Sequence, residues 1–314
     1  MGNDNSAIPG FKLLHTLHNH QAKFNNIAWT PNGLSLTSSS SDNRISLWDT
    51  ISGKICRIFE GHAGEIKSLA WSPDERYLAS GDTLYNILIW DPLTRKIHRK
   101  LSGHNGIIKQ IEFSSVRNLL GSCSDDQSIF VWDIVHVEIL LSIQGHNSEV
   151  NTISWSPDGF LLASGSSDES VCVWDVRSGT LLKTLWGHTD SISCVAWSPD
   201  GRFLATSSKD TTIIILDVIS GKEERILDEH SGSVQSLNFS GRNPIMVSKS
   251  IDNTIRFWHT EKWETIAILN EYTTRIESPT PAFHPTGPVI ATSGDEDTKI
   301  HIWRIDHSIL LGNK

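Results

Sequence analysis

A histidine, a serine and an aspartate that follow one another near the middle of the chain form a combination that can do chemistry. His146 is followed by Ser164 and Asp168, with Trp174 just beyond them. A serine activated by a histidine, which a carboxylate in turn orients, is the arrangement by which many hydrolases attack acyl groups. Taken alone, this set would predict a hydrolase.

The same set recurs along the whole chain, and this repetition argues against catalysis. The hydroxyl position is held in turn by Ser38, Ser80, Ser122, Ser164, Thr206, Ser248 and Ser293. A hydrolase needs one nucleophile, whereas a hydroxyl group repeated in every unit indicates a shared structural duty. We therefore predict no catalytic residue and no enzymatic activity.

Two independent series of residues define the repeat. The histidines lie 42 residues apart, at His20, His62, His104, His146, His188 and His230, and Tyr272 takes the next place. The same interval separates Trp48, Trp90, Trp132, Trp174, Leu216 and Trp258, and Trp303 follows after 45 residues. A period of this length is typical of repeat architectures. The chain is therefore predicted to contain seven units, the last with an insertion in residues 273–285.

Each unit is predicted to form four short strands. In unit four, EVNTISW (149–155) alternates apolar and polar residues as a half-buried strand does, and the turn SPDG (156–159) follows. FLLASG (160–165) and the β-branched run SVCVWD (170–175) continue the pattern. The turn RSGT then leads into TLLKTLW (180–186). The fold class is therefore all-β.

These units resemble the WD-repeat (Trp-Asp repeat) family of seven-bladed β-propellers. The resemblance covers residues 11–305 and rests on the Gly-His pairs 61–62, 103–104, 145–146 and 187–188 together with the Trp-Asp pairs 48–49, 90–91, 132–133 and 174–175. Departures are the missing glycine before His20 and His230, Leu216 in a Trp position and Tyr272 in a His position. None of them removes a strand, so the fold that the resemblance implies is kept.

The ring is expected to close through the N-terminal segment. FKLLHTLHNH (11–20) is similar to the fourth strands of other units but has no first three strands before it, and little chain follows Trp303. Residues 11–18 should complete blade seven, because a closed ring leaves no unpaired edge at the seam. The expected organisation is an N-terminal tail (1–10), one propeller (11–305) and a C-terminal tail (306–314).

The resemblance implies that the repeated polar residues form hydrogen-bonded tetrads, each pinning one blade. Complete tetrads are expected in units one, three, four and six: His20, Ser38, Asp42, Trp48; His104, Ser122, Asp126, Trp132; His146, Ser164, Asp168, Trp174; and His230, Ser248, Asp252, Trp258. Unit five keeps His188, Thr206 and Asp210 without the Trp. Unit two keeps His62, Ser80 and Trp90 but has Leu84 where the others have the aspartate. There, Asp82 or Asn86 could substitute in part, or His62 could bond to the backbone or to water.

Partner binding is expected on the face that carries the histidine loops and the aspartate turns, here called the top face. Alternation along the first strand of each blade places a set of polar residues there, which are Lys23, Asn25, Lys67, Lys109, Asn151, Arg275 and Glu277. Their basic members form an arc over four consecutive blades that suits an acidic peptide or a small anion; the alternative is a solvated rim of mixed charge. An apolar set is expected on the same face, namely Leu84, Tyr85, Ile107 and Trp186. An exposed Trp suits an interface anchor, although it could also pack over a loop.

Composition limits the possible functions. The net charge of −9 argues against broad nucleic-acid binding, and no apolar run is long enough to predict a membrane span. The four cysteines have no CxxC spacing and are expected to be reduced thiols of a cytoplasmic protein. The sequence contains no HExxH motif or phosphate loop, so no metal or cofactor is expected.

We expect a non-catalytic scaffold that holds a peptide segment or a protein subunit on the top face, around the central channel. It should be a monomeric propeller within a larger complex or chain, and its partner should include an acidic segment. The alternative is a ligand-sensing regulatory module of a prokaryotic-type signalling protein, whose effector domain is attached or associated.

Overall fold

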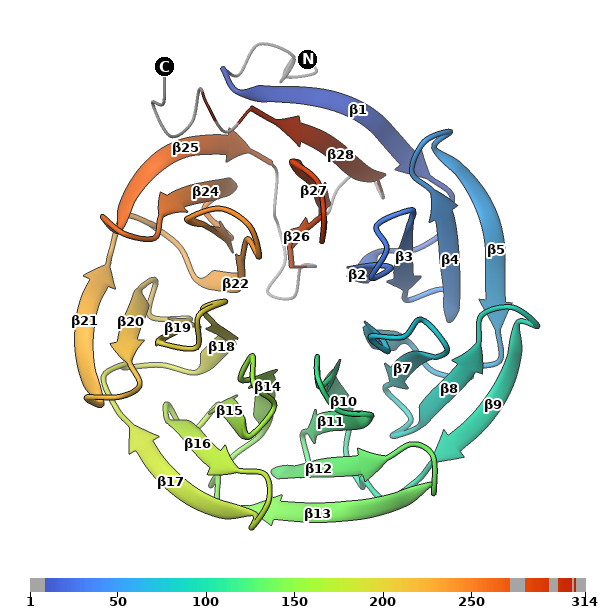
Figure 1. Cartoon of the computed structure of the whole chain (residues 1–314), viewed down its shortest axis with the longest axis horizontal. Helices are drawn as coiled ribbons and strands as arrows, with labels where there is room; N and C mark the ends of the chain where they lie inside the picture. The colour runs from blue at the N-terminus through green and yellow to red at the C-terminus, as the bar shows by residue number, and fades with distance from the viewer. Residues whose placement is uncertain (1–8, 272–279, 294–298, 307, 309–314) are drawn as a thin grey trace.

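The chain folds into seven four-stranded antiparallel sheets that stand around a central axis like the blades of a propeller (Figure 1). The computed structural model describes residues 9–271, 280–293, 299–306 and 308. Within these residues there is no helix of the length and apolar character needed to cross a bilayer. The predicted all-β fold with seven blades is confirmed.

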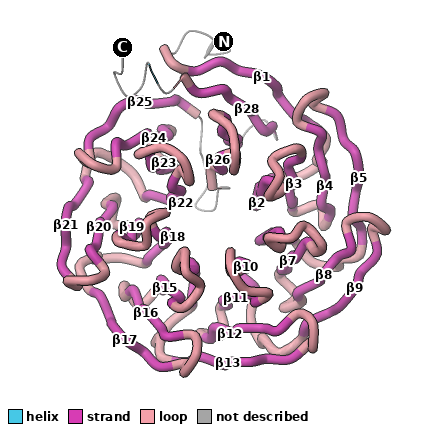
Figure 2. The backbone as a smooth tube through the Cα atoms, viewed as in Figure 1, coloured by secondary structure: helices cyan, strands magenta, loops and turns pink. Residues whose placement is uncertain are grey.

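Within blades one to six the strands run in sequence order from the axis to the rim (Figure 2). Blade one consists of β2 (Phe24–Trp29), β3 (Ser35–Ser40), β4 (Arg44–Asp49) and β5 (Lys54–Glu60). Blade two consists of β6 (Ile66–Trp71), β7 (Leu78–Asp82), β8 (Ile87–Asp91) and β9 (Lys96–Leu101). Blade three consists of β10 (Ile108–Phe113), β11 (Leu119–Ser124), β12 (Ser128–Asp133) and β13 (Glu138–Gln144).

The next three blades repeat this order. Blade four consists of β14 (Val150–Trp155), β15 (Leu161–Ser166), β16 (Val171–Asp175) and β17 (Thr180–Leu185). Blade five consists of β18 (Ile192–Trp197), β19 (Phe203–Ser208), β20 (Ile213–Asp217) and β21 (Lys222–Leu227). Blade six consists of β22 (Val234–Phe239), β23 (Ile245–Ser250), β24 (Thr254–His259) and β25 (Glu264–Asn270).

Blade seven joins the two ends of the chain. It consists of β26 (Ala282–Phe283), β27 (Val289–Ser293), β28 (Lys299–Ile305) and, at the rim, β1 (Phe11–His18). The side chains of Phe11 and Leu17 are buried, and the Phe11 ring lies 4.8 Å from that of Phe257 in blade six. The predicted closure by the N-terminal strand is confirmed, and its buried side chains link it to the core as well as to the strand edge.

Turn residues and buried strands follow the sequence pattern closely. In the turn of blade four, the Ser156 hydroxyl donates to Asp158 Oδ1 at 2.6 Å and Gly159 has a φ of +69°. A φ in the left-handed region is the conformation that glycine adopts without a steric cost. The neighbouring strand β16 is a buried β-branched run because packed blades cover both of its faces.

Neighbouring blades are held together by apolar packing and by hydrogen bonds from inner-strand side chains. The indole nitrogens of Trp155 and Trp197 donate to main-chain carbonyls of the preceding blade, at 3.0 and 3.1 Å. Between blades six and seven, the fully buried Lys249 in β23 donates to the carbonyl of Ser293. These contacts orient the inner strands, which border the central channel.

Candidate functional site

The expected tetrads of blades one, three, four and six are hydrogen-bonded. Histidine Nδ1 lies 2.7–3.1 Å from the aspartate, and Nε2 lies 2.7–2.9 Å from the serine Oγ. Each Trp indole donates to the same Oγ at 2.8 Å. With Nδ1–H donating to a carboxylate, Nε2 of a neutral ring accepts the serine O–H. Each serine is therefore both a donor and an acceptor within its blade.

Electrostatics favour an ionised aspartate in these tetrads and a neutral histidine in blade four. Burial opposes ionisation of Asp126, but hydrogen bonds from His104, Ser128 and a backbone N–H outweigh it and hold the pKa of the carboxyl below its usual range. Burial likewise lowers the pKa of His146, although Asp168 opposes that shift. The lowered pKa keeps the imidazole of His146 uncharged at neutral pH.

Blade two has a complete tetrad, which corrects the expectation that it lacks an aspartate. Asp82 Oδ2 lies 2.7 Å from His62 Nδ1, and Ser80 Oγ accepts from Trp90 at 2.7 Å. Asp82 Oδ1 also accepts the backbone N–H groups of Leu84 and Asn86, as the turn aspartate does elsewhere. Of the substitutes considered, Asp82 takes the role, because its longer side chain reaches His62 from a position where the other blades have serine.

Blades five and seven vary the tetrad in different ways. In blade five, His188 lies 2.9 Å from Thr206 and 2.8 Å from Asp210, and Leu216 packs in place of the Trp. In blade seven, Trp303 donates to Thr292 at 3.0 Å, so Thr292 and not Ser293 is the hydroxyl residue. Thr292 lies 11 residues before Trp303, whereas the serine lies 10 residues before the Trp in the other blades that have this bond. One extra residue of this unit therefore lies after Thr292, which corrects the expectation that the whole insertion is in residues 273–285. Glu271 accepts from Thr292 at 2.9 Å, whereas Tyr272 lies outside the described residues.

The basic residues expected on the top face are partly neutralised by neighbouring acids. Lys67 Nζ lies 3.6 Å from Glu65, and Lys109 Nζ lies 3.1 Å from Asp125. Both lysines and the half-buried Lys23 lie at the starts of blades one to three. Arg275 and Glu277, the remaining members of the expected arc, lie outside the described residues.

Two residues expected to contact a partner also connect adjacent blades. Asn25 donates to the carbonyl of Ile66 at 3.0 Å. Asn151 donates to the carbonyl of Ile192 at 2.9 Å and to Ser191 at 3.1 Å. Because the amide protons are used inside the ring, these side chains have an evident structural role on the top face.

The apolar set is exposed to different degrees. Leu84 and Tyr85 are 51% and 44% exposed, and Ile107 is half-buried. The Leu84 side chain also lies close to the loop that carries His62, because a Cβ added to Gly64 of that loop would lie 2.8 Å from Leu84 Cγ. Trp186, directly after β17, is 68% exposed. It is the more open of the aromatic candidates, because the described residues around it leave most of its ring in solvent.

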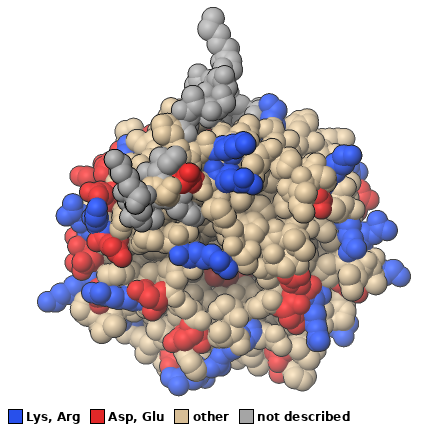
Figure 3. All heavy atoms as spheres, turned by 45° about the horizontal axis from the view of Figure 1, so that its top comes forward, with Lys and Arg blue, Asp and Glu red and all other residues tan. Residues whose placement is uncertain are grey.

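A cavity of about 560 Å³ occupies the central channel below the top face. The space-filling view in Figure 3 shows a hollow near the middle of the ring, with basic side chains beside it. Lys67, Lys109 and the exposed Lys209 line the cavity, and so does Glu112 of β10. Sequence reasoning did not select Glu112; the available signal was a glutamate where the equivalent positions have Ala28, Ala70, Ser154, Ala196 and Asn238.

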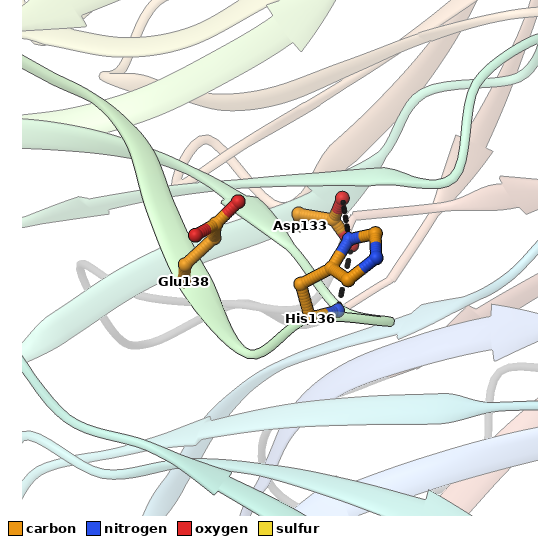
Figure 4. A group of neighbouring side chains, drawn as sticks. All are labelled: Asp133, His136 and Glu138. Atoms are coloured by element: carbon orange, nitrogen blue, oxygen red, sulfur yellow. Dashed lines mark hydrogen bonds and ion pairs between the residues drawn. The ribbon is translucent and has the colours of Figure 1, made fainter.

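One group of side chains has the spacing of metal ligands. Asp133, His136 and Glu138 present ligand atoms within 4.8 Å of one another on the turn before β13 (Figure 4). His136 Nδ1 lies 2.8 Å from Asp133, which raises the pKa of the imidazole and so weakens it as a metal ligand. His136 and Glu138 are exposed, and their contacts are ordinary for a surface turn.

Comparison with known families agrees with this geometry. The family model described as "WD domain, G-beta repeat" matches residues 11–49, 53–91, 95–133, 137–175, 179–217, 221–259 and 267–304. A search of curated proteins found no match. The matched segments end at or next to the Trp position of each unit, and together they cover most of the chain.

Proposed function

Because the chain belongs to the WD-repeat family, whose propellers commonly act as protein-interaction scaffolds, we propose that it is a non-catalytic scaffold. It binds a peptide segment or a protein subunit on its top face, around the mouth of the channel. The observation that carries this proposal is the combination on one face of an open cavity, clustered lysines and a Trp that is 68% exposed. Interfaces concentrate binding energy in such aromatic anchors beside charged groups.

The repeated His–Ser–Asp sets support the absence of catalysis. The serines Ser80, Ser122 and Ser164 have no exposed surface, and each accepts a hydrogen bond from a buried Trp. A nucleophile must reach the substrate and must be free to move its proton to the histidine. These hydroxyl groups face a histidine but have no surface from which to reach a substrate, so the sets serve the stability of the blades.

The charge pattern supports a partner with an acidic segment. The exposed Lys209 adds a cation to the partly buried Lys67 and Lys109 at the channel mouth, while the protein as a whole carries a net charge of −9. A local basic surface in an acidic protein attracts an acidic ligand without attracting polyanions in general. We propose that the propeller works as a monomer within a larger assembly.

Substituting Lys67, Lys109 and Trp186 by Ala tests the proposal. The triple variant should lose partners that the wild-type protein captures from its source cells, and its thermal unfolding should be unchanged. A matched control replaces Ile51, Leu93 and Ile219, which are 78%, 81% and 83% exposed on turns at the opposite ends of the strands. If the first variant keeps every partner, or if only the control loses them, the binding face has been assigned wrongly.

The alternative, a ligand-sensing module, draws support from the channel cavity alone. A volume of about 560 Å³ is large enough for a small molecule.

A further inference from the structure

Glu112 is the acidic residue of the inner channel wall. The cavity is lined by Glu112, Ser154, Ala196 and Asn238, which hold the same place in blades three to six. Three of these four side chains are small or uncharged, so they leave open space in front of the carboxyl group. Glu149, the other acid lining the cavity, is exposed at the mouth.

The polar side chains around Glu112 are used in hydrogen bonds that do not involve its carboxylate. Gln110 accepts the backbone N–H of Ile153 at 3.1 Å, and Thr152 accepts that of Val195 at 3.1 Å. The Trp155 indole donates to the main-chain carbonyl of Glu112, not to its side chain. Among the described residues, no side chain donates a hydrogen bond to this carboxylate or forms an ion pair with it.

The titratable groups that line the cavity are Lys67, Lys109, Lys209, Glu149, Cys194 and Glu112 itself. Lys67 and Lys109 face the acids Glu65 and Asp125 at the mouth. Burial raises the pKa of Glu112 to about 8, although a hydrogen bond from the backbone N–H of Trp155 acts in the opposite direction and lowers it. Burial also raises the pKa of the Cys194 thiol to about 11, with Glu112 contributing to the shift. Glu112 is half-buried, and a carboxylate that is partly removed from water without a cation beside it costs free energy, which a cationic ligand would recover.

We propose that the channel binds a slender cationic group, an ammonium or a guanidinium, against the Glu112 carboxylate. The lysines at the mouth would repel a ligand that carries only a positive charge. They would attract a ligand whose cationic group reaches Glu112 while its carboxylate stays at the mouth. The ligand is therefore a basic group with an acidic group next to it. Either a free basic amino acid or a basic residue within an acidic peptide has this chemistry. In the second case the inference deepens the proposed function and rests on it.

Calorimetric titration tests this assignment at about pH 9, where the carboxyl is ionised. The probes are free arginine, free lysine, and an acetylated pentapeptide with arginine between two pairs of aspartates. The same peptide with glutamine in place of arginine is the control ligand. Binding of the amino acids and the arginine peptide would identify a ligand-sensing channel, whereas binding of the arginine peptide alone would identify a peptide site.

The variant Glu112→Gln should bind each active probe at least about tenfold more weakly. The glutamine side chain can still accept a hydrogen bond from the backbone N–H of Trp155. Thermal unfolding checks that the variant is folded. Glu149→Gln, which removes an exposed carboxylate from the same cavity, should bind within about twofold of wild type. Wild-type affinity should also fall at about pH 6, where Glu112 is protonated.

The inference is wrong if the wild-type protein binds none of the three probes, or if Glu112→Gln binds as well as wild type. Either result leaves the proposed function open, because partner capture through Lys67, Lys109 and Trp186 is measured separately. Conversely, amino-acid binding together with a top-face variant that keeps every partner would refute only the scaffold proposal.

Discussion

At the scale of single residues, blade two shows how a repeat can keep its hydrogen bonds while changing its surface. The other complete blades have serine two residues before the aspartate, as in Ser124 and Asp126. Blade two has Asp82 and Leu84 at these places, and Asp82 makes the bonds to His62 and to the turn. Leu84 is therefore released from the tetrad and presents 51% of its surface to solvent.

This exchange predicts a compensating pair of substitutions. Asp82→Ser should cost about 1–3 kcal/mol of unfolding free energy, because His62 loses its carboxylate partner. Adding Leu84→Asp should restore most of that loss, since the pair recreates the serine and aspartate of the other blades. Leu84→Asp alone should not stabilise the protein, because two carboxylates would then share one histidine. Chemical denaturation of the three variants measures this, and additive losses in the double variant would disprove the exchange.

At the scale of elements, β1 stabilises the ring in two ways. It pairs with β28 along its whole length, and it buries Leu17 to 1% exposure between the strands of blades seven and one. Blade seven depends on this strand because β26 is only two residues long. An unpaired β28 would also offer its edge to other chains.

Substitution of Leu17 tests the contribution of the closing strand. Leu17→Ala should lower the unfolding free energy by about 2–5 kcal/mol, because the cavity left in a packed core cannot fully collapse. Leu13, on the same strand but 39% exposed, is the matched control, and Leu13→Ala should cost less than about 1 kcal/mol. Removal of residues 1–18 should cause aggregation. A monodisperse truncated protein with unchanged melting would mean that closure needs no N-terminal strand.

At the scale of the whole molecule, the stability of the fold depends on pH through different residues at low and at high pH. The tetrad aspartates have lowered pKa values, so the stability that they contribute is present above about pH 4 and is lost below it. His146 also has a lowered pKa, so its proton uptake on unfolding removes stability below about pH 6.5. Glu112 acts in the opposite direction, because its folded pKa of about 8 lies above its unfolded value.

The variant Glu112→Gln should therefore gain stability over wild type as the pH rises. The folded carboxyl binds its proton more tightly than the unfolded one, so the cost of Glu112 grows from about pH 4.5 to about pH 8 and then stays constant. Urea denaturation at about pH 5 should show little difference, and at about pH 9 the variant should be more stable by at least about 1 kcal/mol. A constant difference across this range would show that the carboxyl is not buried in the channel.

The sequence by itself determined the number of blades, their strand order, the closing strand and most tetrads. Each of these follows from a period, an alternation or a pairing of similar segments, which are local properties of the chain. Only the tertiary structure decided that Asp82 replaces the missing aspartate, that Thr292 takes the place counted to Ser293, and that Asn25 and Asn151 join adjacent blades. It also revealed that the carboxyl of Glu112 lines the channel without a cationic partner among the residues that the structure describes. These features depend on side-chain reach and on which groups from different blades meet around the axis, and spacing along the chain does not encode either.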